Sequence, residues 1–436
     1  MATTSYVPRA RAGVAPIAAQ GAACGLVLAA FALAAGAAAH PLQLVPASRG
    51  GTPGWLTGPL RGLGVGSSSA SFQLLLLAMC ALYVTVLVLH EHLGARALWG
   101  AIVLAHAAFL LGPPLLSADV FGYLDFARLG ALHGLDPYTH TALSAPHDAV
   151  FPFLGWHDVR SPYGPLWTLL SYALVPLGLP TGLWALKMIA VLSSLGCAAL
   201  IWRCAAAAGC SPRAATALYA LNPLVLVFAV GGAHNETLLE LLVAAGVALL
   251  LAGSERAAAG ALVAAVAVKA SAGLALPFAL LGAHRRRAFM LAVAGALVVA
   301  ALVGIAGFGA HGGTFVSALR GQQRYIALHS VPSEVSRALG LGRLAAGVRA
   351  LFAAALVVAV GASLLVAWRA RGRWLDALGW STIALLVCTA WLLPWYGAWA
   401  LVPAALSRER RLRWSAVALS FYLVATRLAA LDPLLG

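Results

Sequence analysis

The chain consists mostly of long apolar runs separated by short polar connectors. A helix needs about 20 predominantly apolar residues to cross the ~30 Å hydrocarbon core of a bilayer, and runs of this order recur along the whole sequence. We expect full membrane-spanning helices at residues 16–40, 71–90, 97–117, 183–204, 214–231, 237–252, 288–309, 346–368, 374–393, 395–406 and 413–431. The pattern predicts an all-α polytopic integral membrane protein with about 11 full transmembrane helices.

The composition supports a membrane protein. Hydrophobic residues make up 62% of the chain and charged residues only 9%, against roughly 25% charged residues in soluble domains. The net charge of +15 comes from arginines clustered in the connectors, as topology determinants are, so we expect no nucleic-acid partner. The six cysteines lie mostly in apolar runs without C-x-x-C spacing, which argues against a zinc or redox motif.

Two apolar segments do not fit simple crossings. Residues 164–180 are too short, and we predict a half-inserted helix on the outer face. Residues 257–283 are interrupted by Lys269, Ser271 and Gly273, and we predict a re-entrant helix pair with both ends cytoplasmic.

With these two segments treated as partial insertions, the charges of all connectors are consistent with one topology. Arg9 and Arg11 place the N-terminus, residues 1–15, in the cytoplasm, and the later basic connectors also fall inside. Residues 16–436 then form a single multi-span membrane domain with its C-terminus outside. Its long outer loops are 118–163, which is the predicted catalytic loop, and 310–345.

The polar motifs gather on the predicted outer face, beginning with the segment after the third span. Asp119 lies just past the end of a span, before a helical stretch, and is a candidate functional carboxylate; its alternative role is an N-cap. Asp125 and Arg128, three residues apart on this helix, are candidates for substrate binding or form a structural ion pair. Tyr138 follows Pro137 in a predicted turn and is a further candidate for substrate binding.

Further candidates for substrate binding lie in four other segments. Tyr163 directly precedes the first irregular apolar segment and Lys269 interrupts the second, while Trp395 and Tyr396 could form a saccharide platform or an aromatic-belt anchor. His234, Asn235 and Glu236 could bind hydroxyls, a phosphate or a metal, although Asn235 could instead cap the following helix. Arg320, Arg324 and His329 could bind a donor phosphate, or belong to a solvated loop attracted to lipid headgroups.

At these residues the chain resembles the GT-C superfamily of polyprenyl-phosphate-sugar-dependent transferases. Within it, the resemblance is greatest to the actinobacterial polyprenol-phosphomannose-dependent alpha-1,6-mannosyltransferases of lipomannan assembly, the MptA/MptB branch. The ordered set of strings carries the resemblance, and its members are Ser117–Val120, Gly134–Tyr138, Ser161–Trp167, Asn222-Pro223, Gly231–Glu236, Val268–Ala270 and Leu393–Tyr396.

The resemblance implies that Asp119 is the catalytic carboxylate and that the half-inserted helix and re-entrant pair are GT-C features. It implies a polyprenyl-phosphate-mannose donor, a lipid-linked glycan acceptor and an inverting transfer with an alpha-1,6 linkage. Two departures leave the acceptor and linkage open: family members often have Asp where Glu236 stands, and the chain is short for the branch.

We therefore expect a membrane-embedded glycosyltransferase whose active site faces outward. No cofactor is required, although a divalent metal could take part, and the oligomeric state is open. The alternatives are a transferase for another lipid-linked sugar such as arabinofuranose, a lipid or solute transporter or flippase, and a structural membrane subunit.

Overall fold

The computed structural model describes residues 14–40, 45, 51–309, 318, 320–321 and 324–428, and helices form its regular secondary structure. Most of the predicted N-terminal segment, residues 310–317 of the second outer loop and the predicted end of the last span lie outside the described residues. The main helices are α1 (Val14–Ala39), α3 (Ser69–Leu89), α4 (Ala95–Leu111), α5 (Asp119–Ala131), α6 (Pro165–Tyr172), α7 (Gly178–Ala207), α8 (Pro212–Ala220), the π-helix η8 (Leu224–Val230), α9 (Glu236–Leu251), α10 (Glu255–Val268), α11 (Ala275–Gly282), α12 (Arg286–Phe308), α14 (Val331–Ala338), α15 (Ala346–Arg369), α16 (Trp374–Cys388), α17 (Leu401–Ala405) and α18 (Arg410–Ala425).

Several of these helices can cross a membrane. By length and apolarity the candidates are α1, α3, the run Pro165–Ala207, α12 and α15, with the pair α8 and η8, bent by 46°, as a sixth. The total of about 11 crossings therefore stays a prediction. The ends of several predicted spans were wrong: α4 ends at Leu111, α16 at Cys388 and α18 at Ala425, because apolar residues continue beyond the helix into loops. Pro113 and Pro114 stop α4, since proline cannot continue the helical hydrogen bonding.

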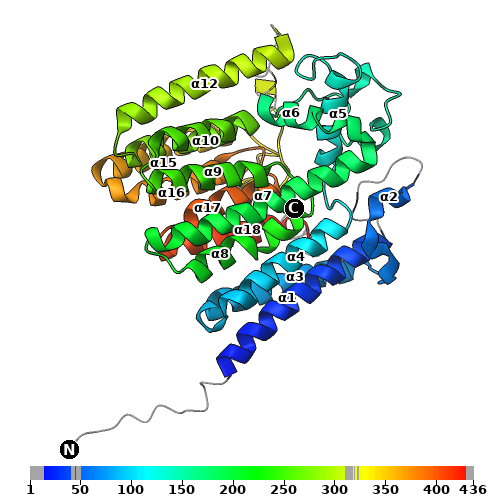
Figure 1. Ribbon diagram of the computed structural model, residues 1–436, viewed down its shortest axis with the longest axis horizontal. Coiled ribbons are helices and arrows are strands. Elements are labelled where there is room, and N and C mark those ends of the chain that lie inside the picture. The colour runs from blue at the N-terminus through cyan, green and yellow to red at the C-terminus, as the bar shows by residue number, and fades with distance from the viewer. Residues whose placement is uncertain are drawn as a thin grey trace, which may run out of the picture.

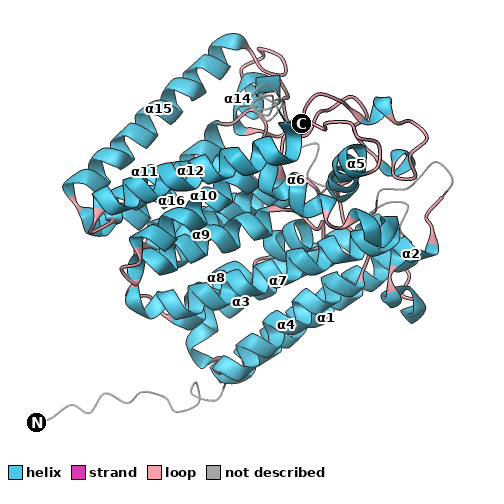
Figure 2. Cartoon of the chain, turned by 45° about the horizontal axis from the view of Figure 1, so that its top comes forward, coloured by secondary structure: helices cyan, strands magenta, loops and turns pink. Residues whose placement is uncertain are grey.

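Helices α12 and α15 lie along the edge of the bundle (Figures 1 and 2). Only 11% of the most apolar window of α12 and 6% of that of α15 are buried within the chain. Such an apolar and exposed helix surface is suited to contact with lipid.

The predicted re-entrant pair is a helical hairpin. Helix α10 ends at Val268, the chain reverses at Lys269, and α11 returns to Gly282. The two ends meet, because the Arg285 backbone N–H donates to Glu255 Oε1 at 3.3 Å. The hairpin geometry agrees with the prediction and places Lys269 at its tip.

The predicted half-inserted helix is the eight-residue helix α6. Pro165 occupies its first turn, as predicted, and α7 begins at Gly178 rather than at the predicted residue 183. Gly164, just before α6, donates its N–H to Val268 O at 2.9 Å. A Cβ at Gly164 would lie 2.1 Å from Ala267 O, so only glycine permits this approach of α6 to the hairpin tip.

The basic connectors meet at one end of the bundle. Arg213 Nη1 donates to Glu91 O at 3.0 Å, and Arg408 Nε donates to Ala208 O at 2.9 Å. Helices α5 and α6 lie at the opposite end (Figure 1). The relative placement of basic connectors and polar motifs therefore follows the pattern predicted from the charges.

Candidate active site

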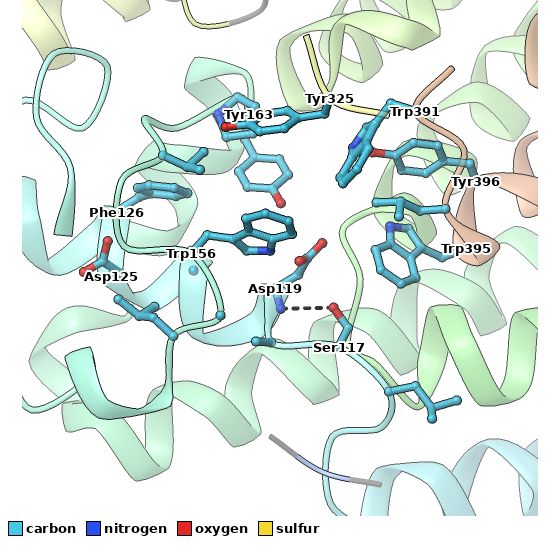
Figure 3. A pocket seen from close by; sticks show the side chains of 18 of the residues that line it. Ser117, Asp119, Asp125, Phe126, Trp156, Tyr163, Tyr325, Trp391, Trp395 and Tyr396 are labelled. Carbon is cyan, nitrogen blue, oxygen red and sulfur yellow. Dashed lines mark hydrogen bonds between the residues drawn. The ribbon is translucent and has the colours of Figure 1, made fainter. Parts of the chain in front are cut away.

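A cavity of about 270 Å³ lies where the polar motifs converge (Figure 3). Its wall comes from five segments far apart in the sequence, which are residues 116–126, 154–163, Tyr325, 391–396 and Arg427. Ring side chains form much of the wall, and carboxyl groups come from Asp119 and Asp125. This combination of aromatic faces with a few polar groups is typical of a small-molecule site.

Asp119 is the first residue of α5 and projects into the cavity (Figure 3). Its backbone N–H donates to Ser117 Oγ at 3.1 Å. The N-cap alternative was wrong, because the cap residue is Ala118 and the Asp119 side chain faces the cavity. Burial and the nearby charge of Glu236 raise the pKa of Asp119 to about 6, while the Lys269 ammonium opposes the shift.

His234 lies directly behind Asp119. Its Nδ1 is 3.5 Å from Asp119 Oδ2, and its ring stacks on Trp395 with centroids 3.7 Å apart and planes 19° apart. Burial, together with the Lys269 ammonium, holds the pKa of His234 well below its usual range, so the imidazole is neutral. A neutral ring fixed in this way can donate one hydrogen bond to the carboxylate.

Asn235 and Glu236 continue this buried segment. The capping alternative for Asn235 was wrong: it occupies the N-cap position of α9, but its side chain makes no capping hydrogen bond. Both polar atoms of that side chain are buried without a hydrogen-bond partner. Glu236 forms an ion pair with Lys269, whose ammonium lies 4.3 Å from the centroid of the Tyr396 ring. The hairpin tip is thereby fixed to the start of α9.

Two strained backbone positions flank these residues. Leu116 has φ 59° and Ala233 has φ 56°, a region that non-glycine residues seldom occupy. The two segments are joined directly, because the Leu115 N–H donates to Gly231 O at 3.0 Å. Strain of this kind persists where surrounding contacts impose it, and here it accompanies the placement of Asp119 beside His234.

Comparison with known proteins identifies the family. Residues 18–285 match a family model described as alpha-(1->6)-mannopyranosyltransferase, N-terminal domain, and residues 329–429 match the MptB C-terminal domain. The chain belongs to the alpha-(1->6)-mannopyranosyltransferase family. The resemblance inferred from the ordered motifs is confirmed.

Relatives in this family differ in how much of their length the chain covers. Alpha-(1->6)-mannopyranosyltransferase A of Mycobacterium tuberculosis is 33% identical over 342 residues, which is 70% of this chain and 64% of that protein. The protein of the same name from Corynebacterium glutamicum is 31% identical over 151 residues, 33% of this chain and 30% of that protein. The chain thus spans less than two thirds of the length of these relatives. No solved structure matches it.

In this mannopyranosyltransferase-family chain the predicted pair of Asp125 and Arg128 does not form. Arg128 Nε instead contacts Asp148 Oδ1 at 2.7 Å, and His133 contacts the other oxygen of Asp148 at the same distance. The loop that follows α5 folds back and supplies a closer acceptor than the helix does. Asp125 therefore faces the cavity while Arg128 secures the loop.

The two candidate tyrosines have different positions. Tyr163 lines the cavity. Tyr138 is fully buried, and its hydroxyl donates to Tyr163 O at 3.0 Å, so it supports the cavity wall without lining it. The turn predicted around Pro137 is present, since Tyr138 N–H donates to Asp136 Oδ1 at 2.8 Å. Trp395, Tyr396 and Tyr163 are thus the predicted aromatic residues that reach the cavity.

A second cavity of about 490 Å³ adjoins the first and shares Trp156, Trp391, Leu393 and Arg427 with it. Its basic groups come from His329, Arg343 and Arg427.

The predicted phosphate-binding residues differ in their relation to these cavities. His329 lines the second cavity and contacts Glu334 at 2.9 Å. Arg320 and Arg324 are exposed and line neither cavity.

Arg427, Trp156 and Trp391 were not identified as candidates from the sequence. Arg427 lies within the predicted span 413–431, where an ionisable residue is a functional candidate by default, and this signal could have revealed it. The two tryptophans lie in irregular loops, where no helical periodicity predicts which way a side chain faces. In the part of the chain that the structure describes, no group of three or more His, Cys, Asp or Glu side chains is arranged to hold a metal ion.

Proposed function

We propose that this chain is a membrane glycosyltransferase that transfers mannose from a polyprenyl-phosphate-mannose donor to a lipid-linked glycan of the lipomannan or lipoglycan type. The reaction inverts the anomeric centre and forms an alpha-1,6 linkage. It takes place on the outer face of the cell membrane, with the N-terminus in the cytoplasm. Family membership and the Asp119 cavity, at the end of the bundle away from the basic connectors, support this proposal.

The observation that carries the proposal is the environment of Asp119. A pKa raised to about 6 leaves the group ionised at neutral pH yet more basic than an ordinary aspartate, as a general base should be. The acceptor hydroxyl oxygen attacks the anomeric carbon and its proton passes to Asp119. The bond from that carbon to the phosphate oxygen breaks, and the polyprenyl phosphate leaves with the electron pair.

One carboxylate is enough for this chemistry. A glycosidase needs a second carboxyl group because its leaving alkoxide must be protonated, whereas a phosphate leaves as a stable anion. His234 has a positioning role, because its neutral ring can hold Asp119 by a hydrogen bond after a small movement from 3.5 Å.

The phosphate is placed at the junction of the two cavities. Arg427 reaches both of them, and its side chain has no hydrogen-bond or ion-pair partner among the described residues. An arginine fork suits a phosphate, and positive charge is most effective where negative charge develops in the transition state. Arg343 extends this positive wall into the second cavity, which His329 also lines. An outward-facing site also has no access to cytosolic nucleotide sugars, whereas a lipid carrier enters sideways from the bilayer.

The test is sugar transfer by the purified chain in liposomes, with labelled polyprenyl-phosphomannose and a mannosylated acceptor, with and without a chelator. Asp119→Asn should lower transfer by ~10²- to 10⁴-fold, the usual contribution of a general base. Asp158→Asn is the matched control, because Asp158 is exposed in the same loop and does not line the cavity. Equal transfer by Asp119→Asn and wild type would refute the assignment, and no transfer by wild type would redirect attention to other lipid-linked sugars and to transport.

A further inference from the structure

Asp125 is a carboxyl group for which the reaction above has no role. It is only 4% exposed, yet it lines the catalytic cavity. It has no hydrogen-bond or ion-pair partner among the described residues. A buried carboxyl group without partners is costly, and such groups in a cavity are candidates for ligand contact.

The charged groups around Asp125 are directed elsewhere. Arg128 and His133 both bind Asp148. Burial, and then the charge of Asp148, raise the pKa of Asp125 to about 7, with His133 and Arg128 opposing the shift. Near neutral pH this carboxyl group can therefore both accept and donate hydrogen bonds, as recognition of sugar hydroxyls requires.

The position of Asp125 relative to Asp119 suggests what it contacts. Both residues belong to α5, six positions apart, which corresponds to about 9 Å along a helix axis at 1.5 Å per residue. Gly122 lies between them, also lines the cavity and has no side chain to fill it. Both carboxyl groups therefore line one cavity, with no side chain between them at position 122.

The cavity also has two distinct ends. Asp125 and Trp391 lie on opposite sides of Asp119 (Figure 3). Trp391 belongs to the wall shared with the basic second cavity, where the donor phosphate is placed. In an inverting transfer the nucleophile and the leaving group occupy opposite faces of the anomeric carbon. The acceptor therefore approaches from the side away from Trp391, which is the side of Asp125.

We propose that Asp125 binds hydroxyl groups of the acceptor sugar and so determines which acceptor is used. The assignment rests on the proposed function. Asp125 makes and breaks no covalent bond; it holds the acceptor ring while Asp119 takes the proton of the reacting hydroxyl. Phe126, which lines this cavity and not the second one, offers a ring face for the apolar side of the sugar.

The experiment measures separate KM values for donor and acceptor with Asp125→Asn in the liposome assay, with Asp158→Asn as control. The acceptor KM should rise roughly 10- to 100-fold, as expected when a hydrogen bond to a charged group is weakened. The donor KM should change by less than about twofold. Among mannosyl acceptors that each lack one hydroxyl, at least one should be penalised about tenfold by wild type and not by the variant.

The outcomes separate this assignment from the proposed function. Unchanged acceptor KM, or an increase confined to the donor KM, overturns the acceptor role while leaving the transferase proposal intact. No transfer by wild type with any acceptor overturns both. If Asp125→Asn does not fold, Asp125→Glu moves the carboxyl group by one methylene and should produce the same acceptor-specific increase in KM; an unchanged acceptor KM in that variant overturns the role.

Discussion

Replacing Lys269 by methionine should test how the hairpin tip supports the site. The substitution keeps an apolar stem of similar length but removes the ammonium that pairs with Glu236. Glu236 is fully buried, so its carboxylate would be left without a compensating charge. Removing one partner of a buried ion pair typically costs about 3–5 kcal/mol of the free energy of unfolding.

The loss of unfolding free energy in Lys269→Met should lie within this range. The side chain of Lys269 is 13% exposed and that of Glu236 is not exposed, so solvent screens the pair only weakly. The ammonium also contacts the Tyr396 ring at 4.3 Å, a cation–π contribution that the variant loses as well. Most of the loss in unfolding free energy comes from the unpaired Glu236 carboxylate, so replacing that carboxylate by a neutral group should restore most of the stability.

The assay is equilibrium unfolding of the purified chain in mixed detergent. We expect Lys269→Met to lose about 3–5 kcal/mol and the double variant Lys269→Met, Glu236→Gln to regain most of that loss. Arg160→Met, at an exposed position in the first outer loop, serves as control and should change stability by about 0.5 kcal/mol or less. A single variant as stable as this control, or a double variant no better than the single one, would refute the reasoning.

Two further predictions concern the reaction itself. Because the pKa of Asp119 is raised to about 6, the group takes up a proton as pH falls through 6, and kcat/KM should decline about tenfold per pH unit below that value; a level profile down to pH 4.5 would contradict a base with this pKa. Arg427→Gln should raise the donor KM roughly 10- to 100-fold and leave the acceptor KM unchanged, in contrast to Asp125→Asn. Initial rates measured while each substrate is varied in turn give the two KM values. A rise in the acceptor KM in place of the donor KM would contradict the role of Arg427.

Local patterns predicted local structure well. The start of α5 at Asp119, the separate helix α6 and the reversal at Lys269 all follow from short-range features: a polar residue at the end of an apolar run, a proline in a first turn and an interrupted apolar segment. The grouping of basic connectors at one end follows from charge alone.

The contacts that were predicted wrongly or not at all join residues distant in sequence. Arg128 binds Asp148, twenty residues away, although Asp125 is three residues away on the same helix. Asn235 has a residue type typical of helix caps, yet its backbone is αR (φ −69°, ψ −8°) and not extended as in a capping residue, and its side chain makes no capping hydrogen bond. Arg427 lines the same cavity as Asp119 only through the packing of α18 against the rest of the bundle. Helical periodicity carries no information on such contacts.

The ion pair at the hairpin tip has a consequence for how the chain enters the membrane during synthesis. Glu236 lies 33 residues before Lys269, so the carboxylate reaches the bilayer before its partner does. Each charge alone would make insertion of its own helix unfavourable. We therefore expect α9 and the hairpin, residues 236–282, to leave the insertion machinery together as one unit that contains both members of the charge pair.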